Sequence, residues 1–217
     1  MADTLLIKVC GLKRRQDVEL CGALGVDMVG FIFHEPSLRS IRPEQVAELP
    51  RGRFLRVGVV VRQRTAAITD IMHRAELDLV QFHGEQDHHD AAAIGPQRVI
   101  RVVWPERFAS KAALQAYLDA WADSCRYFLC DSGVAGGGHG RELQSAVALQ
   151  QIVFPRPWLL AGGIGAENVR KKITKFQPDG VDMNSGVENA PGEKNRGQLI
   201  AAVRTVRQSP LPVQSGE

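Results

Sequence analysis

A cysteine and an aspartate end two apolar segments that lie far apart in the sequence. Cys10 closes the segment Leu5 to Cys10, and Asp131 closes the segment Tyr127 to Asp131. In both places a run of β-forming residues gives way to glycine and turn residues, which in an α/β barrel is the rim where side chains meet the substrate. A thiol and a carboxyl group in these positions are a candidate general base and a candidate general acid.

Each of these residues also has an ordinary structural explanation. A cysteine is commonly a small buried core residue, as we expect for Cys21, Cys125 and Cys130. An aspartate at a strand end is commonly a cap for the segment that follows. If Asp131 faces a cavity, ionisation carries a desolvation cost, so we expect it to be hydrogen bonded or held in the protonated form that a general acid needs.

The surrounding segments repeat a strand-then-helix order eight times. The expected strands are Leu5 to Cys10, Met28 to Phe33, Phe54 to Val61, Leu79 to Phe82, Arg98 to Val103, Tyr127 to Asp131, Trp158 to Ala161 and Val181 to Met183. The expected helices are Arg15 to Leu24, Pro43 to Leu49, Ala66 to Ala75, Asp87 to Ile94, Ala112 to Trp121, Leu143 to Ile152, Glu167 to Phe176 and Gln198 to Val206.

This order predicts an α/β fold, a (β/α)8 TIM barrel with a closed, parallel, eight-stranded sheet. Several strands are apolar on both faces, as is typical of parallel strands that are covered on both sides. A doubly wound open sheet is the alternative, because periodicity does not report closure. No linker divides the series, so we expect a single catalytic domain over 1–207 and a flexible polar tail over 208–217.

Glycine-rich turns follow three of the late strands. They lie at Gly136 to Gly140, at Gly162 and Gly163, and at Asn184 to Gly186. Exposed backbone N–H groups in such turns bind anions, and barrels commonly hold a phosphate beside strands seven and eight. The three turns together favour a small phosphorylated substrate, although any one of them could serve only as a tight turn.

Four further polar residues are candidates for the same rim. Arg39 lies in the loop after the second strand, where its guanidinium could bind a carboxylate with two hydrogen bonds. Gln81 and His83 share one face at the end of the fourth strand, and Asp182 lies in the eighth. Solvation of the arginine and burial of the histidine in the barrel are the structural alternatives.

Composition narrows the function classes. The 217 residues are 44% hydrophobic and 24% charged, with a formal net charge of +3, so neither a disordered chain nor a nucleic-acid partner is indicated. No apolar run is long enough to span a membrane and no secretory signal is present, which favours a cytoplasmic location. The four cysteines form no CxxC motif, so no metal site is expected. A monomer and a homodimer are both consistent with the sequence.

Taken together, these motifs resemble one family, the phosphoribosylanthranilate isomerases, in order and spacing. The resemblance covers nearly the whole chain. It rests on Lys8 to Leu12, Gly30 and Phe31 with Ser37 to Arg39, Val80 to Glu85, Leu129 to Ser132 with the glycine run that follows, Leu160 to Gly163, Gly180 to Glu188, and Pro191 to Lys194.

The resemblance implies an Amadori rearrangement in tryptophan biosynthesis, with Asp131 as the acid that opens the ribose ring and Cys10 as the base that removes the proton from C2. Arg39 would then hold the anthranilate carboxylate, and N–H groups near Gly162, Gly163, Ser185 and Gly186 would hold the phosphate. Gln81, His83 and Asp182 match pocket positions. Neither step requires a metal, a nicotinamide or a flavin as cofactor.

The sequence departs from the family pattern at four positions. Leu38 stands where proline is usual, His139 where threonine is usual, and Met183-Asn184 where valine and serine are common. These changes concern substrate affinity more than reaction type. The alternatives are another phosphosugar barrel enzyme, such as an aldose-ketose isomerase of histidine synthesis or a pentose-phosphate epimerase, and a non-catalytic barrel that binds a phosphorylated ligand.

Overall fold

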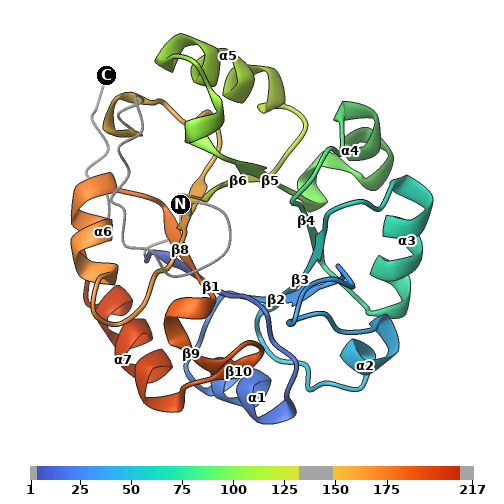
Figure 1. Ribbon diagram of the computed structural model, residues 1–217, viewed down its shortest axis with the longest axis vertical. Coiled ribbons are helices and arrows are strands. Elements are labelled where there is room, and N and C mark those ends of the chain that lie inside the picture. The colour runs from blue at the N-terminus through green and yellow to red at the C-terminus, as the bar shows by residue number, and fades with distance from the viewer. Residues whose placement is uncertain (1–3, 132–148, 211–217) are drawn as a thin grey trace.

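Eight parallel strands close into a ring in the computed structural model of the chain, which describes residues 4–131 and 149–210 (Figure 1). The strands are β1 Leu6–Val9, β2 Met28–Ile32, β3 Leu55–Val60, β4 Leu79–Phe82, β5 Val99–Val103, β6 Tyr127–Asp131, β7 Trp158–Ala161 and β8 Gly180–Met183. Each strand pairs with the next, and β8 pairs with β1 from Leu6 opposite Gly180 to Val9 opposite Met183. The predicted closed barrel is confirmed, and the open-sheet alternative is wrong.

Helices surround this ring on the outside (Figure 1). They are α1 Arg15–Ala23, α2 Pro43–Ala47, α3 Thr65–Arg74, α4 His88–Ile94, α5 Lys111–Trp121, α6 Val169–Phe176 and α7 Arg196–Arg207. Short 3₁₀ helices are η1 Pro96–Arg98, η2 Pro105–Arg107, η3 Leu149–Gln151 and η4 Ser185–Val187, and a small hairpin consists of β9 Glu188–Ala190 and β10 Glu193–Lys194. The expected helix Leu143 to Ile152 lies largely outside the described residues, and its described end is η3. The hairpin was not expected.

Two separate apolar clusters show which way the strand side chains point. One cluster contains only residues of the strands and their ends, among them Met28, Val57, Leu79 and Leu129, and so fills the barrel. The other combines alternate strand residues with buried residues of the helices. Because side chains alternate along a strand, positions two residues from an inner one also face inward. Asp131, two residues after Leu129, therefore faces the interior.

The start of α4 shows how a short polar helix can be fixed locally. The carboxylate of Asp87 accepts a hydrogen bond from the Asp90 N–H at 3.0 Å, and the carboxylate of Asp90 accepts one from the Asp87 N–H at 3.2 Å. This reciprocal cap satisfies N–H groups that the first turn would otherwise leave unpaired. It anchors the end of the loop that carries His83. Within the described residues, no helix is both long and apolar enough to cross a bilayer.

Candidate active site

Cys10 follows β1 directly and lies at the inner rim. Leu6 packs against the inner cluster and Lys8 is fully buried, so alternation turns Cys10 toward the interior as well. Its N–H donates to the Met183 carbonyl at 2.9 Å, and the residue is 4% exposed. Gly30 on β2 makes room for the thiol, since a Cβ atom there would lie 2.7 Å from the Cys10 Sγ.

A buried ion pair lies one step deeper in the barrel. The Lys8 Nζ lies 3.0 Å from the Asp182 Oδ2, and the two side chains are 0% and 8% exposed. Burial by itself would lower the pKa of Lys8, but the carboxylate of Asp182 raises it above its ordinary value. The lysine is therefore a fixed positive charge. The second oxygen of Asp182 is buried without a hydrogen-bond partner within the described residues, which suits an acceptor for a polar ligand.

The protonation of Cys10 depends on opposing effects. Burial raises the pKa of the thiol above its ordinary value, and the Asp182 carboxylate adds to that shift. The ammonium groups of Lys8 and Lys194 act in the opposite direction and favour the thiolate. The resting form is thus a thiol, and the two lysine charges make its deprotonation less costly than burial alone would allow.

His83 is a neutral imidazole that contacts the ring of Trp104. Burial, with the charge of Lys8, lowers the pKa of His83 to about 4, so the ring is uncharged at neutral pH. Its Nδ1 lies 3.3 Å from the Gln81 Nε2, and its ring meets that of Trp104 edge-on with centroids 5.1 Å apart. The Oε1 atom of Gln81 is buried without a partner among the described residues. A neutral imidazole and an open amide oxygen can hydrogen bond to sugar hydroxyls.

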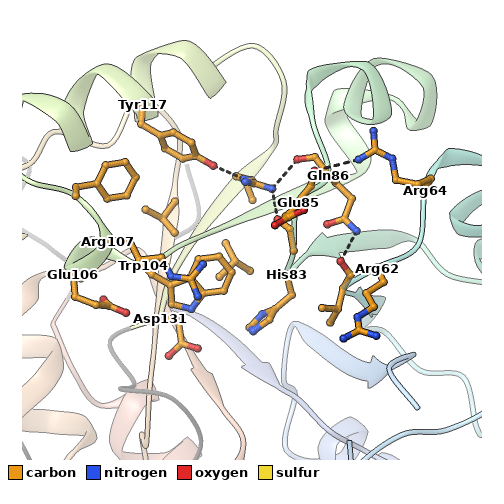
Figure 2. A pocket seen from close by; sticks show the side chains of 16 residues that line it. Arg62, Arg64, His83, Glu85, Gln86, Trp104, Glu106, Arg107, Tyr117 and Asp131 are labelled. Carbon is orange, nitrogen blue, oxygen red and sulfur yellow. Dashed lines mark hydrogen bonds between the residues drawn. The ribbon is translucent and has the colours of Figure 1, made fainter. Parts of the chain in front are cut away.

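A cavity of about 1010 Å³ opens at the rim between β3 and β6. Asp131 and His83 both line it and point toward the same end (Figure 2). Trp104 lies beside His83, and the Arg107 guanidinium stacks 4.0 Å above the Trp104 ring. Cys10, Arg39, Gln81 and Asp182 lie outside the residues that line this cavity. The expected glycine run Gly136 to Gly140 lies outside the described residues.

The turns after β7 and β8 approach one another through their backbones. A Cβ atom at Gly165 would lie 2.2 Å from the Gly186 carbonyl oxygen, so only glycine permits this contact. The carbonyls of Gly162 and Gly163 accept hydrogen bonds from Lys172 and Asn168 of the segment that forms α6, at 2.5 and 2.8 Å. In a trans peptide the following N–H points the opposite way.

The N–H groups of Gly163 and Ile164 therefore point away from the Lys172 and Asn168 side chains. Ser185, the first residue of η4, lies beside them through the contact between Gly165 and Gly186. The four predicted phosphate-binding residues thus lie close together on the rim.

Arg39 forms an ion pair with the carboxylate of Glu188. Its Nε and Nη2 atoms donate to Glu188, with distances of 3.0 Å and 2.6 Å to the Oε2 atom. Sequence reasoning assigned no role to Glu188, nor to Lys194, whose Nζ lies 2.8 Å from the other Glu188 oxygen. Lys8 could have been suspected, because it shares a strand face with Cys10. Within the described residues, no group of three or more His, Cys, Asp and Glu side chains is placed to hold a metal ion.

The closed ring of strands defines the class of this protein: it is a (β/α)8 barrel, and its candidate site residues lie toward the carboxyl ends of the strands. The sequence model of the N-(5′-phosphoribosyl)anthranilate isomerase family matches residues 7–205. The chain therefore belongs to that family, whose members are isomerases. This membership sets aside the other phosphosugar enzymes and the non-catalytic barrel.

Relatives and solved structures agree with this assignment. The isomerase of Desulfovibrio desulfuricans is 51% identical over 199 residues, which cover 92% of this chain and 94% of the relative. The isomerase of Maridesulfovibrio salexigens is 40% identical over 205 residues, which cover 94% of this chain and 100% of the relative. The crystal structure of the Thermotoga maritima isomerase matches with a TM-score of 0.79 at 28% identity, over 94% of this chain and 98% of that one.

A further solved isomerase was crystallised with reduced 1-(o-carboxyphenylamino)-1-deoxyribulose 5-phosphate. It matches with a TM-score of 0.75 at 27% identity, over 94% of this chain and 98% of that one.

Proposed function

We propose that the protein converts N-(5-phosphoribosyl)anthranilate into 1-(2-carboxyphenylamino)-1-deoxyribulose 5-phosphate, with Asp131 as general acid and Cys10 as general base. Membership of the isomerase family supplies the activity, which belongs to tryptophan biosynthesis. The two roles rest on one observation. A thiol after β1 and a carboxyl group at the end of β6 face the interior of a closed ring from different sides.

The proposed reaction is an internal oxidation and reduction. Asp131 gives a proton to the ring oxygen of the ribose, the C1–O bond breaks, and an iminium ion forms between C1 and the anthranilate nitrogen. The thiolate form of Cys10 then takes the proton from C2, which the iminium has made acidic, and an enolamine results. The enolamine tautomerises to the ketone. C2 is oxidised while C1 is reduced, so the step needs no external electron acceptor.

The remaining site residues would bind the substrate. We assign the phosphate to backbone N–H groups near Gly162, Gly163, Ser185 and Gly186. A second set would orient the sugar and the aromatic acid: Arg39 for the anthranilate carboxylate, and Gln81, His83 and Asp182 for the ribose hydroxyls. Support for the second set comes from the buried oxygens of Gln81 and Asp182, which have no hydrogen-bond partner among the residues that the structure describes, and from the neutral state of His83.

The proposed activity is tested with the purified protein and N-(5-phosphoribosyl)anthranilate. Substrate fluorescence should decay on addition of the protein, and chromatography should recover the carboxyphenylamino-deoxyribulose phosphate in equal amount. Fluorescence that persists at high protein concentration would contradict the proposal. A variant with Glu193→Gln serves as a matched preparation, because that carboxylate is half exposed and contacts Arg14 rather than the rim.

A charge effect on Cys10 follows from the position of Lys8. Replacing Lys8 by methionine removes a charge that favours the thiolate, so the pKa of Cys10 rises further. Each unit of rise leaves about tenfold less thiolate at neutral pH, and we expect kcat/KM at pH 7 to fall by about tenfold or more. The pH profile of kcat/KM between pH 6 and 10 checks this, since its ascending limb, which follows deprotonation of the base, should move to higher pH in the variant. An equal loss at every pH would show that Lys8 acts through the fold instead.

The organisation of the molecule belongs to the same proposal. We propose a single catalytic domain over 1–207, a cytoplasmic location, and a monomer or homodimer without nucleic-acid or membrane partners. Most of the expected flexible tail over 208–217 lies outside the described residues. Support comes from the barrel, which begins at β1 and is completed by α7, and from the small phosphorylated substrate of the family. Light scattering on the purified protein distinguishes the monomer from the dimer.

A further inference from the structure

A network of buried charges centred on Glu188 connects the loop after β2 with the small hairpin after β8. The Arg39 Nε lies 3.1 Å from the Glu188 Oε1 and 3.0 Å from the Oε2, and the Nη2 lies 2.6 Å from the Oε2. The Arg39 side chain is 23% exposed, whereas that of Glu188 is only 3% exposed. The pair thus joins a carboxylate that is almost inaccessible to a guanidinium that can still meet a ligand.

Glu188 is fixed from its other side by the hairpin itself. Its Oε1 accepts hydrogen bonds from the Lys194 Nζ at 2.8 Å and from the Gly192 N–H at 3.1 Å. Lys194, also buried, donates in turn to the side chain of Asn184 at 3.1 Å, directly after β8. Gly192 has φ +82°, a conformation that favours glycine and closes the tight turn between β9 and β10. The carboxylate therefore has little freedom to move.

The charge state of Glu188 fits a permanent anchor. Burial by itself would raise the pKa of this carboxyl, but hydrogen bonds from Arg39 and Lys194 bring it below its ordinary value. The group is ionised at neutral pH. A charge-assisted, forked contact between a carboxylate and a guanidinium fixes orientation as well as position.

The contacts to Glu188 use only one edge of the guanidinium. Nε and Nη2 point at Glu188, while Nη1 makes no hydrogen bond within the part of the chain that the structure describes. The edge formed by Nη1 and the second Nη2 hydrogen can donate two hydrogen bonds to another carboxylate in the same forked geometry. The backbone of this loop is held by local hydrogen bonds: the Ser37 N–H donates to the His34 carbonyl at 2.8 Å, the Arg39 N–H to the Ser37 hydroxyl at 3.2 Å and the Ser40 N–H to the Ser37 carbonyl at 2.9 Å. Leu38 is 74% exposed.

We infer that Glu188 is a positioning residue for Arg39: it binds the Nε–Nη2 edge of the guanidinium so that the adjacent Nη1–Nη2 edge is presented to the carboxylate on the aromatic ring of the substrate. The inference rests on the proposed function, in which Arg39 binds that carboxylate. It assigns to the hairpin β9–β10 the task of ordering the arginine before the substrate arrives, which lowers the entropy cost of binding.

The test compares two substrates in the wild-type protein and in Glu188→Gln. The first is N-(5-phosphoribosyl)anthranilate, and the second is N-(5-phosphoribosyl)aniline, which lacks the carboxylate. In the variant we expect KM for the anthranilate substrate to rise by about tenfold with kcat within about threefold, because a neutral amide orients the guanidinium poorly. KM for the aniline substrate should stay within about twofold of the wild-type value.

Two further variants complete the comparison. Arg39→Met should remove the preference for the carboxylate substrate entirely, and Glu193→Gln, in the same hairpin, should change nothing. Glu188→Gln leaves Lys194 without its buried counter-charge, which could prevent the single variant from folding. In that case the measurement is repeated with the double variant Glu188→Leu and Lys194→Met, which removes both charges. The double variant should show the same loss of preference.

Three results would overturn the inference. An equal rise of KM for both substrates would mean that Glu188 supports the fold rather than the arginine. A lower KM for the anthranilate substrate would mean that Glu188 competes with the substrate for Arg39. If the wild-type protein turns over neither substrate, the proposed function is wrong, and this inference falls with it. The measurements on the wild-type protein alone reveal that outcome.

Discussion

Asp131→Asn is expected to lower kcat by about a thousandfold, within the range that loss of a general acid produces. An amide keeps the size of the carboxyl group, but it cannot give a proton to the ring oxygen. The ribose then stays closed, and the iminium that makes C2 acidic does not form. The change is measured as the steady-state rate of loss of substrate fluorescence, with the variant at high concentration so that a thousandfold loss stays above the detection limit.

Two controls separate this chemical effect from a loss of binding. The reduced carboxyphenylamino-deoxyribulose phosphate found in a solved relative should bind to the variant within about threefold of its affinity for the wild type. Glu106→Gln alters another carboxylate at the same cavity and should leave kcat within about twofold. Normal turnover by Asp131→Asn would eliminate Asp131 as the acid.

Cys10→Ala is expected to have an effect of the same size, because it removes the group that takes the C2 proton. Opening of the ring does not depend on the thiol, so the variant should still form the iminium. If exchange of the C2 hydrogen with solvent deuterium is followed by NMR, it should be lost together with turnover. Retention of both would show that another group is the base.

Cys21→Ala is the matched control for this variant. Cys21 is also fully buried, and burial raises the pKa of its thiol to about 12, but it lies in α1 and packs in the outer apolar cluster. Removing it should cost some stability through a small cavity and leave kcat unchanged. The two alanine variants together therefore distinguish a loss of packing from a loss of chemistry.

The order of the elements could be predicted from the sequence because the strands are short apolar runs with clear ends. The observed strands begin and end within two residues of the predicted ones, and the inward side chains follow from alternation once the ring is closed. The capping pair Asp87 and Asp90 is a local signal of the same kind. Closure itself is not local: it requires β1 to pair with β8.

The charge network behind the site was beyond sequence reasoning for the same physical reason. Lys8 and Asp182 are separated by 174 positions, and Arg39 and Glu188 by 149. No periodicity relates such residues, and only the register of β1 against β8 brings the first pair together. Family motifs pointed to Arg39 and also contain Glu188, but the direct contact between the two side chains is a property of the folded rim.

The central claim is that a thiol and a carboxyl group act on one sugar from different sides of the ring. A crystal structure of this protein with the reduced carboxyphenylamino-deoxyribulose phosphate tests it most directly. We predict the Cys10 Sγ at about 3.5 Å from C2 and an Asp131 oxygen within about 3.2 Å of the former ring oxygen, on opposite sides of the sugar. A bound analogue with either group out of reach of its atom, or with both groups on the same side, would contradict the account.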